Sequence, residues 1–126
     1  MATADTDRAT TRPWTSHYTV KATVIVAETA DLRTLEITLG PGEEVPWHFH
    51  HQVEGIFYCL AGGIAVLTRG PDADAQLQPG ETCRVAARRP HRVINTADAD
   101  SRFILVQGPG LYDFVPVGTP RSAGRA

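Results

Sequence analysis

The sequence predicts an all-β fold, an antiparallel β-sandwich or jelly-roll barrel, in a single domain. Short segments rich in β-branched and apolar residues recur along its 126 residues, and none keeps a helical period over roughly ten residues. Turn residues separate these segments at regular intervals, which is typical of sandwiches and barrels. The turns are Pro41-Gly42, Gly62-Gly63, Gly70-Pro71-Asp72, Pro79-Gly80 and Gly108-Pro109-Gly110.

The first two predicted strands are the best defined. Lys21–Glu28 is rich in β-branched residues, and Arg33–Leu39 alternates, with Leu35, Ile37 and Leu39 on one face. The strands expected after them are Val45–His50, Ile56–Thr68 with a break at Gly62-Gly63, Ala75–Leu77, Thr82–Ala86, His91–Asn95, Arg102–Gln107 and Tyr112–Val117.

Composition divides the chain into three parts. Residues 1–17 are polar and without periodicity, which predicts a flexible N-terminal arm; residues 18–117 make the barrel domain, and residues 118–126 a flexible tail. No apolar run approaches the roughly 20 residues of a membrane span, and the start of the chain has no hydrophobic signal segment. A formal net charge of −2 with interspersed signs gives no reason to expect nucleic acid or a membrane as partner.

Cysteine usage indicates the compartment. Cys59 and Cys83 are the two cysteines of the chain, and neither belongs to a C-x-x-C pair. Both lie in apolar strand segments and are expected to be buried thiols. This pattern favours a reducing, cytoplasmic location.

Two histidines mark the candidate site. His48 and His50 lie two residues apart on a predicted strand, so both imidazoles project to the same face, while Trp47 points the other way. Neutral imidazole is the commonest protein ligand for transition metals. Two such groups on one strand make half of a metal site, and His91 is the candidate for a third.

Two ordered blocks of residues connect these histidines. In the first, Pro41-Gly42 is followed by five residues, His48, one residue and His50, and then by Glu54 and Gly62. In the second, Gly80 is followed by ten residues, His91, three residues and Asn95. In this the chain resembles the cupin superfamily, whose small single-domain members carry the motifs PG-x5-H-x-H-x4-E-x6-G and G-x5-P-x-G-x2-H-x3-N. The resemblance implies the double-stranded β-helix, a jelly-roll barrel.

The resemblance also implies a divalent metal, Fe(II), Zn(II), Mn(II) or Ni(II), held by His48, His50 and His91 inside the barrel. The family's fourth ligand, a glutamate, falls on Gly55, and Glu54 stands one position early. Because a one-residue shift turns a strand side chain to the opposite face, Glu54 points outward on a regular strand. Three alternatives follow: an open three-histidine site completed by water, a bulge at Gly55 that delivers Glu54, or a ligand such as Gln52 from the inner wall.

Inward side chains of such a barrel determine the substrate. Phe57 has the inward phase on the strand after the histidine pair, Gln107 ends an apolar strand, and Tyr112 lies near the predicted last strand, where it could cover the mouth. We expect these three residues to line the pocket. Aromatic side chains with few charges favour an uncharged or aromatic small molecule.

The resemblance implies a small metalloenzyme that acts on an organic small molecule as a dioxygenase or as an isomerase, cyclase or lyase. The alternative is a non-catalytic cupin that binds or senses a small molecule and whose metal is structural, which predicts a closed coordination shell. The resemblance further implies a homodimer, paired through strand edges or through the arm of residues 1–17.

Overall fold

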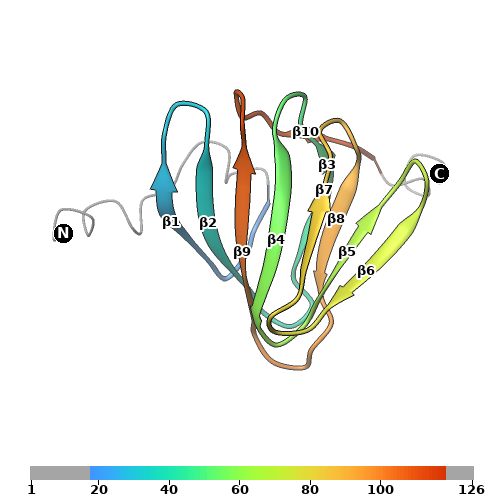
Figure 1. Ribbon diagram of the computed structural model, residues 1–126. Helices are drawn as coiled ribbons and strands as arrows, with labels where there is room; N and C mark the ends of the chain where they lie inside the picture. Colours follow the sequence, from blue (N-terminus) through green and yellow to red (C-terminus); the bar gives the residue numbers. More distant parts are fainter. Residues whose placement is uncertain (1–17, 119–126) are drawn as a thin grey trace, which may run out of the picture.

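The computed structural model describes residues 18–118, and within this range the fold is all-β, as predicted. Two five-stranded sheets face each other, and every strand pair is antiparallel (Figure 1). The predicted arm, residues 1–17, and residues 119–126 of the predicted tail lie outside the described residues. Among residues 18–118, no helix is long and apolar enough to cross a membrane.

The strands alternate between the two sheets in the manner of a jelly roll. The first sheet has the order β1 (Ala22–Glu28), β2 (Arg33–Leu39), β9 (Ser101–Gly108), β4 (Glu54–Ala61) and β7 (Thr82–Val85). The second has the order β10 (Val115–Pro116), β3 (Glu44–Phe49), β8 (His91–Asn95), β5 (Ile64–Thr68) and β6 (Ala73–Leu77).

The strand predicted over Tyr112–Val117 is shorter than expected. Only Val115–Pro116 pairs with β3, and residues 111–114 connect β9 to β10 without regular structure. Asp113 explains part of this difference, because its backbone carbonyl accepts a hydrogen bond from His50 and its carboxylate binds His51. These contacts hold the segment at the site instead of in a sheet.

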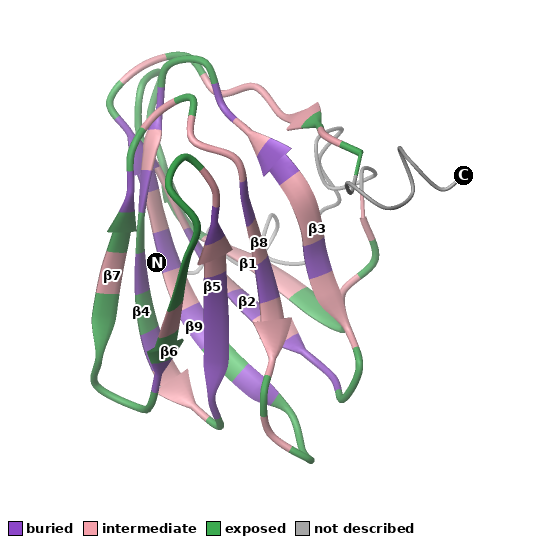
Figure 2. Cartoon of the chain, turned by 90° about the vertical axis from the view of Figure 1, so that its right-hand side faces the viewer, coloured by how far each residue is buried: buried purple, intermediate pink, exposed green. Residues whose placement is uncertain are grey.

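The core lies between the sheets, where the buried segments of Figure 2 face one another. The alternation predicted for β2 is confirmed, since Leu35, Ile37 and Leu39 are buried and the residues between them are half-buried. On β4, Gly55, Phe57 and Cys59 face inward in the same way. The break at Gly62-Gly63 is also confirmed, because β4 ends at Ala61 and β5 begins at Ile64.

A bulge in β3 determines where the first histidine points. Val45 pairs with Val93 and His48 pairs with His91, so three steps along β3 match two steps along β8. The extra residue lies at Pro46-Trp47, where a proline without an N–H is well tolerated. The bulge keeps both Val45 and His48 inward although an odd number of residues separates them. It also places His48 directly opposite His91.

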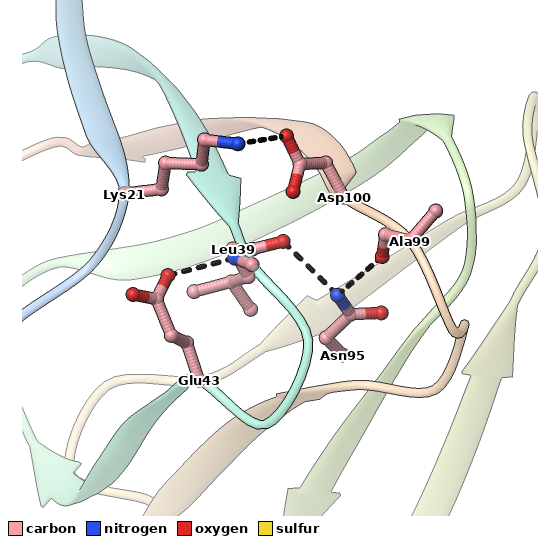
Figure 3. Close-up of polar contacts among 7 residues, drawn as sticks. Lys21, Leu39, Glu43, Asn95, Ala99 and Asp100 are labelled. Carbon is pink, nitrogen blue, oxygen red and sulfur yellow. Dashed lines mark hydrogen bonds and ion pairs between the residues drawn. The ribbon is translucent and has the colours of Figure 1, made fainter.

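Asn95 connects the ends of β2 and β8 to the start of β9 through hydrogen bonds of its side chain. Its amide nitrogen donates to the backbone carbonyls of Leu39 and Ala99 at 3.0 and 2.8 Å (Figure 3). Its amide oxygen accepts from the backbone N–H of Ala97 at 2.8 Å and from the Ser101 hydroxyl at 2.7 Å. Four hydrogen bonds satisfy this side chain fully, so its role here is structural. Asn95 thereby connects the end of β8, four residues from His91, to β2.

Candidate metal centre

Three buried histidines meet inside the barrel. His48 comes from β3, His50 follows the end of β3, and His91 begins β8; each is no more than 4% exposed. One ligand nitrogen from each ring lies within 4.8 Å of the other two. The ring centroids are 4.2 Å apart for His48 and His91, and 4.8 Å apart for His48 and His50. The structure thus brings together all three histidines that the two sequence blocks single out.

Backbone carbonyls fix the tautomer of each ring. The Nδ1 hydrogen bonds run from His48 to the carbonyl of Pro46 (2.7 Å), from His91 to that of Arg89 (3.0 Å) and from His50 to that of Asp113. A carbonyl oxygen only accepts, so each Nδ1 carries the hydrogen and each Nε2 carries the lone pair. Such a second-ring hydrogen bond is the usual support for a metal-binding histidine. Three Nε2 lone pairs therefore converge.

Burial in the protein interior favours the neutral form of two of the imidazoles. Burial lowers the pKa of His91 to about 4 and also lowers the pKa of His50, because the charged form loses its hydration. At neutral pH these two rings are unprotonated. Neutral imidazole is the form that binds a metal ion.

A small apolar cavity contains the cluster. The space that the centre of a water molecule can reach is about 10 Å³, which is about what one water needs. The side chains around the three histidines are mostly aromatic and aliphatic; the aromatic ones are Tyr18, Phe57, Phe103, Tyr112 and Phe114. Among the described residues, the cavity therefore has room for one ion or water molecule at the histidines.

The three residues predicted to line a substrate pocket lie at this cavity, and their contact with a substrate stays a prediction. Phe57, Gln107 and Tyr112 border the cavity together with the histidines. Gln107 and Phe57 are buried, and the Tyr112 ring lies 5.3 Å from the ring of His50. Tyr112 also borders a second, more polar cavity together with Arg33, whose guanidinium lies 4.1 Å from the centroid of the tyrosine ring.

The carboxylate of Glu54 lies outside the cluster. It forms an ion pair with Arg84 at 2.9 Å. Glu54 lies on the same outer face of β4 as the exposed Ile56 and Tyr58. The structure has no bulge that turns Glu54 inward. β4 pairs regularly with β9 at Gly55, and the register of this pair shifts only between Cys59 and Ala61. We therefore leave Glu54 out of the proposed ligand set.

The prediction that the Gln52 side chain points into the barrel, on the same face as His48 and His50, is wrong. β3 ends at Phe49, so the alternation that begins at His48 does not continue to residue 52. Gln52 is exposed, and its amide oxygen accepts a hydrogen bond from the backbone N–H of Leu111 at 3.0 Å. Val53 is the buried residue of this turn. Gln52 is likewise left out of the proposed ligands.

Two supports of the site have no signal in the sequence. The carbonyl of Asp113 orients His50 from 63 residues away, and a backbone carbonyl is present at every position, so no residue type marks it. The ring of Phe114 stacks on His48 with centroids 4.2 Å apart and planes 13° apart. No sequence pattern predicts this contact, because it depends on the irregular path of residues 111–114.

An antiparallel jelly roll with a buried histidine triad defines a class of protein, the barrels built on a double-stranded β-helix. The sequence matches the Cupin domain family over residues 35–107, more than half of the chain, and the chain belongs to this family. No curated protein matches its sequence.

Solved structures share the fold. A conserved protein with a double-stranded β-helix domain from Klebsiella pneumoniae superposes with a TM-score of 0.66 at 21% identity, covering 76% of this chain and 83% of the other. KdgF from Halomonas sp. superposes with a TM-score of 0.63 at 25% identity, covering 71% and 80%. An oxalate oxidase superposes with a TM-score of 0.68 at 17% identity, covering 83% and 65%.

Proposed function

We propose that the chain is a divalent-metal-dependent cupin enzyme that acts on an organic small molecule. One observation carries the proposal: three buried imidazoles meet at an apolar cavity, with one ring nitrogen of each within 4.8 Å of the other two. Three fixed nitrogen ligands suffice for a catalytic metal, which needs at least one further position for its substrate. His48, His50 and His91 would hold the ion, a divalent transition metal: Fe(II), Zn(II), Mn(II) or Ni(II).

A bound ion would act as a Lewis acid toward an enolate, carbonyl or diketone oxygen. The side chains around it bind and orient the substrate and exclude water. Burial raises the pKa of Tyr18 to about 12 and also raises that of Tyr112, so both phenols keep their protons at neutral pH. They offer the substrate hydroxyl groups instead of charges. The lining thus supports a compact substrate that carries oxygen atoms on an apolar frame.

Dioxygenation is one reaction class for this site, and redox-neutral isomerisation, cyclisation or lyase chemistry is the other. Each needs a coordination position that a small molecule can occupy. The alternative function, a binding or sensing cupin with a structural metal, needs a closed shell. Neither Glu54 nor Gln52 reaches the histidines, which favours the enzyme.

Nitric oxide tests for an open coordination position. We expect the protein loaded anaerobically with Fe(II) to bind nitric oxide and give the electron paramagnetic resonance signal of an iron–nitrosyl centre, because three histidines leave room for an exogenous ligand. The His91→Ala variant, treated in the same way, serves as the control and should give no such protein-bound signal. A wild-type protein that binds Fe(II) stoichiometrically but gives no nitrosyl signal would favour the structural metal and contradict the enzyme.

We further propose a homodimer. The outer face of β4 supports this, because Ile56 and Tyr58 are 39% and 42% exposed beside the half-buried Ile104 and Val106 of β9. An exposed apolar patch of this kind favours association. Sedimentation at micromolar concentration should give twice the mass of the chain, and the mass of one chain would refute the dimer. A cytoplasmic location is also a proposal, supported by two thiols, Cys59 and Cys83, that form no disulfide.

A further inference from the structure

Gln107 lies where the fourth ligand of this site is missing. It belongs to β9, is 4% exposed, and borders the cavity beside the histidines. Its cross-strand partner on β4 is Gly55, the position at which the sequence motif calls for a glutamate. Because Gly55 has no side chain, the glutamine on the neighbouring strand is the polar group closest in register to that position.

The amide of Gln107 lies at ligand distance from the histidine cluster. Its Nε2 is 3.4 Å from the Nε2 of His50. Two ligand atoms about 2.1 Å from one ion lie about 3.0 to 3.6 Å apart at angles between about 90° and 120°, which covers ions with four and with five ligands. The terminal atom of the amide therefore occupies a position that a fourth ligand would take relative to His50.

The other terminal atom of this amide, Oε1, also supports a role for Gln107 at the histidine cluster. Oε1 of Gln107 is buried and has no hydrogen-bond partner among the described residues. A buried polar atom without a partner is costly, and native proteins retain few of them. A half-turn about the last side-chain bond exchanges the oxygen and the nitrogen with almost no change in shape. The oxygen then takes the place beside His50, where a metal ion bound by the histidines would satisfy it and would replace the hydrogen bond that Nε2 of Gln107 now makes to His50.

We infer that Gln107 is a fourth metal ligand, bound through Oε1. The inference rests on the proposed three-histidine metal site and adds a neutral oxygen donor from a different strand in place of the family's glutamate. With no anionic ligand, the ion keeps its full positive charge and attracts an anionic substrate oxygen more strongly. Amide oxygen suits Mn(II), and an ion that takes five or six ligands keeps a position for a substrate beside three histidines and one glutamine.

Cobalt(II) titration of the metal-free protein tests this ligand, because both the affinity and the visible absorption of Co(II) report its coordination. Gln107→Leu removes the oxygen donor while keeping the side chain's bulk. We expect this variant to bind Co(II) at least about tenfold more weakly than wild type and with a changed absorption spectrum. Gln107→Glu keeps an oxygen donor and adds a charge, so it should bind Co(II) at least as tightly as wild type.

Gln52→Leu is the matched control, since Gln52 carries the same amide, lies outside the cavity and bonds to Leu111. It should keep the wild-type affinity and spectrum. Thermal melting of each metal-free variant checks the fold, and Gln107→Glu serves as the folded comparison should Gln107→Leu melt early. Wild-type affinity and spectrum in Gln107→Leu, or weaker binding by Gln107→Glu than by Gln107→Leu, would overturn the inference alone. A wild-type protein that binds no Co(II) would overturn the proposed metal site as well.

Discussion

Replacing His91 with alanine is expected to lower the affinity for a divalent metal by more than about a hundredfold, since losing a ligand has a larger effect than losing one of its supports. His91 is buried at the start of β8, opposite His48, and its ring lies 4.2 Å from that of His48. No other described histidine, cysteine or carboxylate joins the cluster, so nothing nearby takes its place. Titration of the metal-free variant with Zn(II) or Mn(II) by calorimetry measures the effect.

His51→Ala is the matched control for this variant. His51 follows His50 in the chain, but its side chain is 57% exposed and its Nδ1 pairs with the carboxylate of Asp113. The same substitution one residue past the cluster should leave the metal affinity at the wild-type value, because the backbone N–H of His51 still donates to the Asp113 carboxylate and the Asp113 carbonyl still accepts from His50. Equal losses at His51 and His91 would show that the effect comes from the fold and not from a lost ligand.

Metal binding is also expected to raise the melting temperature. A ligand that binds only the folded state adds about 2.7 kcal/mol to the free energy of unfolding when it is present at a hundred times its dissociation constant. For a domain of this size that corresponds to an increase of roughly 10 °C. The three histidines come from β3, its end and β8, so they converge only in the folded chain. Differential scanning calorimetry of metal-free and metal-loaded protein measures the shift.

The same scan on His91→Ala separates binding at the histidines from binding elsewhere. Its melting temperature should be nearly the same with and without metal. A shift as large as that of wild type would place the stabilising ion at some other site. An unchanged melting temperature in wild type at saturating metal would contradict the expected coupling between binding and folding.

The sequence was sufficient to predict the barrel and to identify the three histidines that meet inside it. Alternation in Arg33–Leu39 and the turn at Gly62-Gly63 both appear in the structure where they were expected. The histidines were identifiable because a spacing of two on a strand and two ordered motif blocks are local properties. These patterns depend on neighbouring residues, which a sequence displays directly.

The fourth position could not be predicted, since it depends on how separate strands pair. Gln52 was assigned the wrong phase because the end of β3 at Phe49 has no marker in residue type. Gln107 was expected to line the pocket, but its position across from Gly55 follows from the β4–β9 register. The support from Asp113 is a backbone carbonyl on an irregular segment. Each of these features depends on how separate segments of the chain come together. The atoms involved belong to the backbone or to a common residue type, so no sequence motif marks them.

The most direct measurement is the metal content of the protein purified without a histidine tag, with His48→Ala treated identically. Elemental analysis follows isolation and incubation with Fe, Zn, Mn or Ni. We predict about one transition-metal ion per wild-type chain, because one cluster of three imidazole nitrogens is present among the described residues, and little or none in the variant. A wild-type protein that carries no stoichiometric metal and acquires none, or a His48→Ala variant that retains the full amount, would contradict the three-histidine metal centre.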